Sequence, residues 1–251
     1  KTLDFSEFTS SEVSLEFIKE RVFESFRFPE VYNFNGLKEI PDDFALKIAK
    51  DFAENDGTTY TFKGLSELNK TFEDNVIRIP YGKIIFPEKF EEVERSLFTL
   101  DSSKVKKILE LEHCHGESRW RGFKYITAAA ACLVAKEGGA IIRDLVEITP
   151  EVATALAGCL SSISLPSLKS IDVESAKELS NFSPKNKFSN LSLDGLEYLD
   201  DKVAAELAKI RSKGIRITLS FNGIKSLNEN LAKSLSKFKA DQNNGGCLSV
   251  D

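Results

Sequence analysis

The sequence of 251 residues contains no methionine, and no apolar run approaches the roughly 20 residues that a membrane-spanning helix needs. It has only four cysteines, Cys114, Cys132, Cys159 and Cys247, which form neither CxxC pairs nor a regular spacing. This excludes a disulfide-dense scaffold and favours reduced thiols. The formal net charge of −5 provides no overall attraction to nucleic acid or to an anionic membrane.

The motifs of common enzyme classes are also missing, because the chain has no P-loop, GxSxG elbow, Rossmann glycine run or histidine-based triad. Its only two histidines flank a cysteine in His113-Cys114-His115. Imidazole and thiolate can bind zinc or copper, but a structural site wants about four ligands and there is no second cluster. A polar return loop is the favoured interpretation, and no metal or cofactor is expected. An enzyme or metal-binding protein that uses this loop is the open alternative.

What the sequence does contain is a repeat. In each copy an apolar anchor residue is followed by an apolar residue at plus three, a small or apolar residue at plus eight and an apolar residue at plus eleven. The anchors are Leu37, Phe123, Leu145, Leu168, Leu196 and Ile224. Leu65 begins a further copy, in which Glu73 replaces the small residue. Self-similarity with a period of about 20 to 50 residues is typical of a solenoid.

Upstream of the anchors, apolar and polar residues alternate. Tyr60 and Phe62 alternate with Thr61 and Lys63, as Leu219 and Phe221 do with their neighbours. Alternation of this kind predicts a short strand with one buried face. A glycine often stands directly before the anchor, where the chain must turn off the strand; these are Gly36, Gly64, Gly122, Gly195 and Gly223.

Downstream of the anchors, the pattern predicts a short helix. Four residues after the anchor stands a side chain that can accept hydrogen bonds from the first turn of a helix. These N-cap candidates are Asn69, Thr127, Thr149, Asp172, Asp200 and Asn228. The small residue at plus eight is usually alanine, as at Ala204, which lets the helix axis lie close to the strand. One copy is therefore strand, turn, helix and return loop.

Stacked copies can bury both the strand face and the helix stripe, which a single copy cannot do. The sequence therefore predicts a right-handed α/β solenoid with a parallel sheet on the concave side and short helices on the convex side. We expect residues 1–30 to form a degenerate N-terminal cap or repeat, and residues 31–251 the solenoid, with an irregular segment at about 76–95. After this segment Asp101 predicts the start of a further helix, whereas Glu92 and Glu94 exclude a buried strand before it.

The repeat resembles the bacterial leucine-rich-repeat superfamily, particularly arrays of the form LxLxGLxxLxxxxAxxLA. The clearest copy begins Leu191-Ser192-Leu193-Asp194-Gly195-Leu196 and runs to Leu207-Ala208, and the resemblance covers roughly residues 31–75 and 118–251. The usual asparagine ladder is missing, since an apolar residue such as Leu196 stands at its position. The resemblance implies a bacterial binding scaffold, and it brings no catalytic residues.

Strand positions that point away from the core would line the concave face. Two residues before the anchors this column contains the candidate binding residues Asn35, Lys63, Arg121, Arg143, Asp194 and Asn222, with Arg119 beside Arg121. Basic side chains on adjacent strands, about 4.8 Å apart, repel one another unless they meet carboxylates or phosphates. We therefore expect Lys63, Arg119, Arg121 and Arg143 to form a basic patch for an acidic partner, with ordinary solvated surface as the alternative.

The expected function is non-catalytic recognition of a protein, a peptide or a glycan, without nucleic acid. Unpaired cysteines favour a cytoplasmic location, and an exported or cell-surface location stays open because the N-terminus of the full gene product is not visible.

Overall fold

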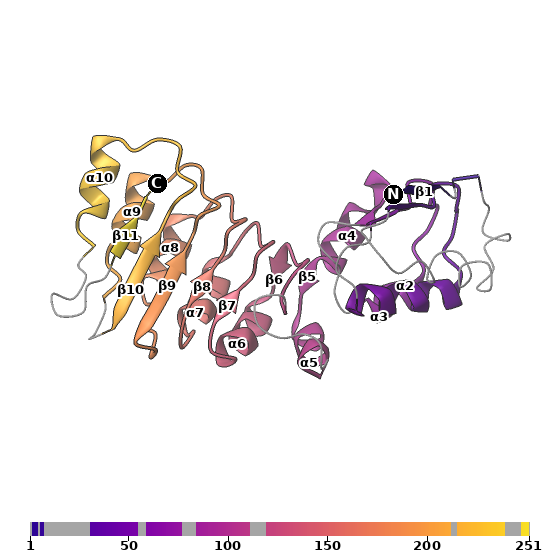
Figure 1. Ribbon diagram of the computed structural model, residues 1–251, viewed down its shortest axis with the longest axis horizontal. Helices are drawn as coiled ribbons and strands as arrows, with labels where there is room; N and C mark the ends of the chain where they lie inside the picture. The colour runs from indigo at the N-terminus through magenta and orange to yellow at the C-terminus, as the bar shows by residue number, and fades with distance from the viewer. Residues whose placement is uncertain are drawn as a thin grey trace. The chain divides into compact units, whose positions relative to one another are not determined.

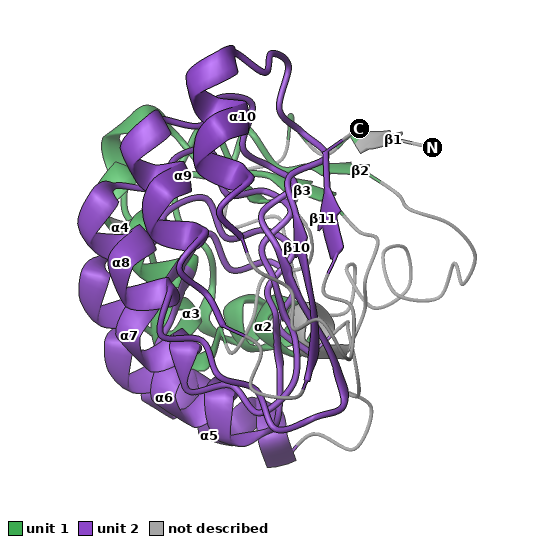
Figure 2. Ribbon diagram, turned by 90° about the vertical axis from the view of Figure 1, so that its left-hand side faces the viewer, with its two compact units in different colours: residues 1–98, 111–113 green, residues 99–110, 114–251 purple. Residues whose placement is uncertain are grey.

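The computed structural model describes residues 2–4, 6–7, 31–54, 59–76, 84–110, 119–211, 215–238 and 247–250. It is an α/β structure in which strands of parallel sheets alternate with helices along the chain (Figure 1). The chain divides into two compact units, residues 1–98 with 111–113 and residues 99–110 with 114–251 (Figure 2). Each unit is described separately below. Among the described residues, none of the helices has both the length and the apolar character to cross a bilayer.

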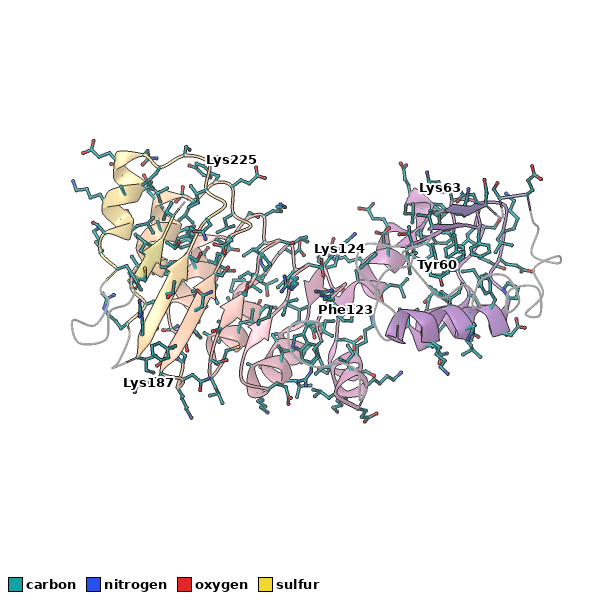
Figure 3. All side chains as sticks on the ribbon, in the orientation of Figure 1. Tyr60, Lys63, Phe123, Lys124, Lys187 and Lys225 are labelled. Atoms are coloured by element: carbon teal, nitrogen blue, oxygen red, sulfur yellow. The ribbon has the colours of Figure 1, made fainter. Side chains whose placement is uncertain are left out.

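Unit 1 contains a four-stranded parallel sheet in the order β1-β2-β3-β4. Its elements are β1 (Thr2–Asp4), β2 (Val31–Asn33), α2 (Asp42–Glu54), β3 (Thr59–Thr61), α3 (Lys70–Asn75), β4 (Ile84–Ile85), the 3-10 helix η1 (Glu88–Phe90) and α4 (Glu91–Leu97). The core is aromatic, because Phe34 and Tyr60 are at most 1% exposed and stack on the rings beside them. In Figure 3, Tyr60 lies between the sheet and the helices, while Lys63 lies at the surface.

Unit 2 contains a five-stranded parallel sheet in the order β11-β10-β9-β8-β7 and a two-stranded parallel pair β5-β6. Its elements are β5 (Thr99–Leu100), α5 (Ser102–Glu110), β6 (Tyr125–Ile126), α6 (Ala128–Lys136), β7 (Ala140–Ile141), α7 (Pro150–Ala157), β8 (Ile163–Ser164), α8 (Val173–Leu179), β9 (Phe188–Ser192), α9 (Asp201–Leu207), β10 (Arg216–Ser220), α10 (Glu229–Leu235) and β11 (Cys247–Ser249). The helices α5 to α10 stack in chain order and cover one face of the strands (Figure 2).

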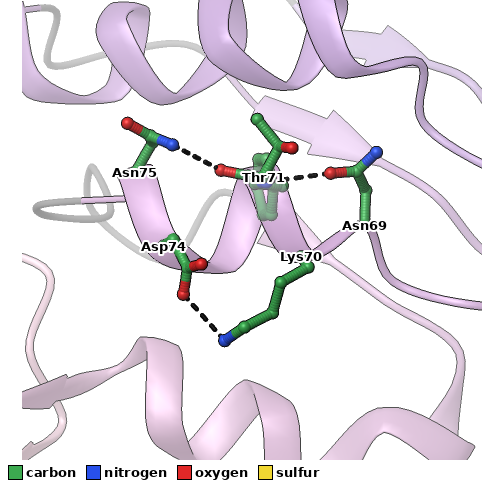
Figure 4. A network of polar contacts seen from close by, with 6 residues as sticks. Asn69, Lys70, Thr71, Asp74 and Asn75 are labelled. Atoms are coloured by element: carbon green, nitrogen blue, oxygen red, sulfur yellow. Dashed lines mark hydrogen bonds and ion pairs between the residues drawn. The ribbon is translucent and has the colours of Figure 1, made fainter.

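The predicted alternation of strands and helices is confirmed. All the strand pairs are parallel, and the anchors Leu37, Leu145 and Leu196 are completely buried. All six predicted N-cap side chains accept a hydrogen bond from the first turn of their helices. Figure 4 shows one of these, in which Asn69 Oδ1 accepts from the N–H of Phe72 at 3.2 Å. The architecture is that of a repeated α/β protein.

Neighbouring copies are also joined by a column of backbone hydrogen bonds just after the anchors. The N–H of the residue after one anchor donates to the carbonyl of the equivalent residue in the preceding copy. The bond from Ser66 to Lys38 measures 2.7 Å, and the one from Lys225 to Glu197 measures 3.1 Å. Because the anchors bury their side chains and their successors join the backbones, each copy is fixed in register against the one before it.

Two of the glycines before the anchors are needed because a side chain at their positions would collide with the preceding copy. A Cβ added to Gly64 would overlap the carbonyl oxygen of Asn35, and one added to Gly223 would overlap that of Asp194. In both pairs the carbonyl belongs to the preceding copy. Of this column, Gly122 has a positive φ of 84°. The glycines at 64 and 223 therefore permit close approach between copies rather than an unusual backbone conformation.

The predictions for the residues between the two clear parts of the repeat are confirmed in part. Leu100, Val105 and Ile108 are buried, and α5 begins directly after Asp101, as predicted. The acidic segment before it forms helix α4 instead of a strand. The predicted boundaries of the cap at 1–30 and of the irregular segment at about 76–95 stay predictions, since residues 1, 5, 8–30 and 77–83 lie outside the described residues.

Candidate binding surface of unit 2

The helix-free face of unit 2 is the face of the five-stranded sheet that α7 to α10 leave uncovered (Figure 2). Strand register aligns its outward side chains in rows that cross the strands. The serine row consists of Ile141, Ser164, Ser192, Ser220 and Ser249. Two residues further along each strand lies a second row, of Arg143, Pro166, Asp194 and Asn222. The middle of this face is thus made of short side chains, of which Ser192 and Ser220 are 4% and 5% exposed.

One pocket lies where the strands β7 and β8 begin. It has a volume of about 360 Å³ and is lined by Arg119, Trp120, Glu137, Gly139, Ile141, Ser161 and Ser162. A volume of this size is at the lower end of the range for small-ligand sites. Gly139 keeps the pocket open toward β8, because a Cβ there would come within 2.6 Å of Ser161 Oγ. The pocket therefore combines an apolar wall, hydroxyl groups and a charged rim.

The charged rim is an ion pair. Arg119 donates to Glu137 at 3.1 Å, and the two side chains are 22% and 38% exposed. The Arg119 guanidinium also lies 5.8 Å from the ring centroid of Trp120, which is itself 3% exposed. A half-exposed pair of this kind contributes little to stability, about 0–1 kcal/mol. Arg119 nevertheless already pairs with a carboxylate, as expected if the basic residues are ordinary solvated surface.

The other basic candidates are placed differently. Arg121 and Arg143 are half-buried in adjacent copies, which are joined by the Gly122 N–H donating to Asp144 Oδ2 at 2.8 Å. Lys63 is exposed but belongs to unit 1 (Figure 3). A single patch that contains all four cations therefore stays a prediction, whereas Arg119, Arg121 and Arg143 share unit 2.

The polar candidates form a ladder between copies. Asn35 Oδ1 accepts from the N–H of Lys63 at 2.8 Å, and Asp194 Oδ1 accepts from the N–H of Asn222 at the same distance. Asn222 Oδ1 in turn accepts from Ser249 Oγ at 2.8 Å. This column, two residues before the anchors, therefore joins neighbouring copies by side-chain hydrogen bonds. A binding role for these residues stays a prediction.

Asp194 is the best-connected member of this ladder. Its carboxylate accepts hydrogen bonds from Ser192 Oγ and Ser220 Oγ, both at 2.6 Å, in addition to the N–H of Asn222. Burial acts to raise the pKa of Asp194, but these three donors outweigh it and hold the pKa below its ordinary value. Asp194 is therefore a stable anion whose acceptor positions the fold itself uses.

Sequence reasoning missed the edge of this face. The strands β9 and β10 are five residues long, so they begin with Phe188 and Arg216, which are exposed register partners. Phe188 is 69% exposed, although a phenylalanine is ordinarily buried. The signal was present, because Phe188 stands eight residues before the anchor Leu196 and has the outward parity. We read only the last positions of each strand.

The described residues hold no group of three or more His, Cys, Asp or Glu side chains that could bind a metal ion. The loop His113-Cys114-His115 lies outside the part of the chain that the structure describes, so the alternative built on it is not tested. Comparison with known proteins found no matching family model, no matching curated protein and no matching solved structure.

Proposed function

We propose that this chain is a right-handed, leucine-rich-repeat-like solenoid that binds an acidic segment of a partner protein or peptide and catalyses no reaction. The binding surface is the helix-free face of unit 2. Repeat scaffolds offer extended sheet surfaces of this kind for binding.

The observation that carries the proposal is the relation between the pocket and the arginines. Arg119 and Ile141 both line the pocket. Arg121 and Arg143 follow them by two residues in the same two copies, so their backbones lie beside the pocket on the same face. Guanidinium groups bind carboxylates in a planar, two-pronged geometry. An acidic side chain that enters the pocket exchanges with Glu137 for Arg119, which costs little because that pair is half-exposed.

A glycan is the second candidate, favoured by the chemistry of the pocket itself. Sugar hydroxyl groups both donate and accept hydrogen bonds, and the pocket offers the Glu137 carboxylate, the Arg119 guanidinium and the hydroxyls of Ser161 and Ser162. The acidic-segment proposal takes precedence because it also gives a role to Arg121 and Arg143.

The experiment is a selection of peptides from a random displayed library on the purified chain. We expect enrichment of Asp and Glu, with affinities that fall as salt is raised. The Arg121→Glu/Arg143→Glu variant should bind the selected peptides at least tenfold more weakly, as measured by fluorescence anisotropy, and circular dichroism checks that the variant is folded. The matched control is Lys177→Glu/Lys233→Glu, which makes the same charge change at exposed positions of α8 and α10.

The proposal is wrong if no acidic peptide is enriched, or if the control weakens binding as much as the arginine variant. Enrichment of neutral oligosaccharides on a glycan array, lost in Glu137→Gln, would instead support the second candidate.

A further inference from the structure

We infer that the bound segment crosses the strands of unit 2 in an extended form, from the pocket beside Arg119 to an exposed aromatic and basic edge at Phe188 and Arg216. This inference rests on the proposed function and adds the position, length and composition of the ligand. The ligand then contacts mainly the first residues of the strands rather than the last ones.

The edge is built by backbone contacts that place its side chains together. Phe188 and Arg216 are register partners on β9 and β10, and the N–H of Arg216 donates to the carbonyl of Lys187 at 3.1 Å. The N–H groups of Lys185 and Asn186 both donate to the carbonyl of Leu160, at 2.8 and 3.1 Å. Leu160 directly precedes the pocket residue Ser161, so the edge continues into the pocket along the sheet.

The edge is apolar in its middle and basic around it. Phe188, the register partner of Arg216, is 69% exposed, and Leu160, whose carbonyl accepts from Lys185 and Asn186 just before Phe188, is 38% exposed. Lys185, Lys187 and Arg216 are exposed, and none of the ion pairs between described residues involves them. In Figure 3, Lys187 lies at the opposite end of the strands from Lys225. A surface of this composition is complementary to carboxylates that flank an apolar side chain.

The span fixes the length of the ligand. Four steps separate the segment that carries Arg119 from β10, by way of β7, β8 and β9. At about 4.8 Å for each step, the distance across the strands is about 19 Å, and Phe188 also lies four residues, about 13 Å, nearer the start of its strand than the row of Arg119. The two ends are therefore about 23 Å apart, which an extended chain rising about 3.3 Å per residue spans with about seven residues.

Between the two ends the bound segment passes over short side chains. Ser162, Asn190 and Thr218 occupy the row between the edge and the serine row, and the Asn190 N–H donates to Ser162 Oγ at 3.0 Å. The ligand should therefore have an acidic residue at each end and an apolar residue near the end that meets Phe188. Because the apolar contact with Phe188 lies at one end only, it fixes the direction in which the ligand lies.

The test uses the full chain and the tightest peptide from the selection described above. Lys187→Glu/Arg216→Glu and Phe188→Ser should each weaken its binding at least fivefold. A peptide that lacks the acidic residue at one of its ends should bind the Lys187→Glu/Arg216→Glu variant as it binds the parent. Shortening the peptide below about seven residues should remove most of the affinity. Lys177→Glu/Lys233→Glu is again the control, and circular dichroism checks that each variant is folded.

If Arg121→Glu/Arg143→Glu abolishes binding while both edge variants bind like the parent, the proposed function stands and the extended footprint is wrong. If neither pair of charges matters, both proposals fall. The inference would also be overturned if the chain bound anionic lipid vesicles or a single-stranded oligonucleotide as tightly as the peptide and lost that binding in Phe188→Ser. The edge would then serve a different class of ligand.

Discussion

Asp194 and Arg216 illustrate how the charged side chains of unit 2 differ at the scale of single residues. Asp194 receives three hydrogen bonds from its own and the next copy, whereas Arg216 is exposed and takes part in none of the ion pairs between described residues. A charge that the fold already uses costs stability when it is removed. A charge that the fold does not use can be reversed with little cost, so its effect on binding can be read directly.

Lys104 is a charged residue that the fold buries. Its Nζ donates to the carbonyl of Thr99 at 2.9 Å and lies 5.8 Å from the ring centroid of Phe123. Burial lowers its pKa from 10.5 to about 8, and Asp101 opposes this only in part. Between these two pH values the unfolded chain binds a proton that the folded chain does not, so the free energy of unfolding rises from pH 8 to pH 10.5.

We therefore predict that Lys104→Met removes this rise. The difference in unfolding free energy between parent and variant should change by up to about 3 kcal/mol over this range, measured by urea denaturation at several pH values. Lys107→Met, at an exposed position of the same helix, should follow the parent at every pH. Parallel curves for the parent and Lys104→Met would contradict the burial argument.

Residue roles were predictable where one chemical property determines them. The six N-cap residues follow from the need for an acceptor at the start of each helix, and all six were identified from spacing alone. Exposure was harder to predict. Ala232 has the spacing of Ala204 but is half-buried, and Leu227 is 52% exposed whereas its equivalent Leu199 is 2% exposed. The repeat pattern does not encode which copy has a neighbour packed on it.

At the scale of elements, the turn from strand to anchor is the most constrained segment of each copy. A Cβ at position 223 would overlap the carbonyl oxygen of Asp194 and come within 3.0 Å of that of Leu196. Both are backbone atoms of the preceding copy, which cannot move without disturbing the sheet. We predict that Gly223→Ala lowers the free energy of unfolding by about 1–3 kcal/mol, measured by urea denaturation.

Gly158→Ala is the matched control for that substitution. Gly158 ends helix α7 with a φ of −76°, and an added Cβ would come no closer than 3.2 Å to the Ala155 carbonyl. Alanine at a compatible backbone position is neutral or stabilising by about 0.4–1 kcal/mol. Equal losses in the two variants would show that close approach between copies is not the constraint.

The helices and strands themselves were predictable because apolar residues recur about every 3.6 residues in a helix and every second residue in a strand. Helix α4 shows why part of the middle was not. The segment containing Glu92 and Glu94 stands where the spacing expects a strand, and its charges only exclude a buried strand without naming the replacement. The early start of β9 at Phe188 was missed for a related reason, since an exposed phenylalanine contradicts the usual burial of its residue type.

At the scale of the whole molecule, the division into two units was not predicted. A repeat that continues on both sides of residue 98 gives no signal there, because a boundary depends on how few contacts cross it rather than on local spacing. The units can nevertheless be observed separately in solution. The single tryptophan, Trp120, is buried in unit 2, so its fluorescence reports on that unit, whereas circular dichroism reports on both.

We predict that overpacking one unit shifts only its own unfolding. Ala45 in α2 and Ala204 in α9 are both completely buried, and leucine at either position should cost about 1–3 kcal/mol. Ala204→Leu should move the tryptophan fluorescence transition to lower denaturant concentration. Ala45→Leu should move only a part of the circular dichroism transition. A tryptophan transition that shifts equally in both variants would show that the two units unfold as one.

The column of backbone bonds between copies has a mechanical consequence. Each bond in it joins residues only 22 to 28 positions apart, from Val146 to Lys124 and from Lys225 to Glu197. When unit 2 is stretched along its stack, every junction between copies carries the same force, and the junctions can separate one at a time because no described bond of this column ties a copy to any but its neighbour. We therefore expect unit 2 to lengthen in steps of one copy, and to shorten by the same steps when the load is released.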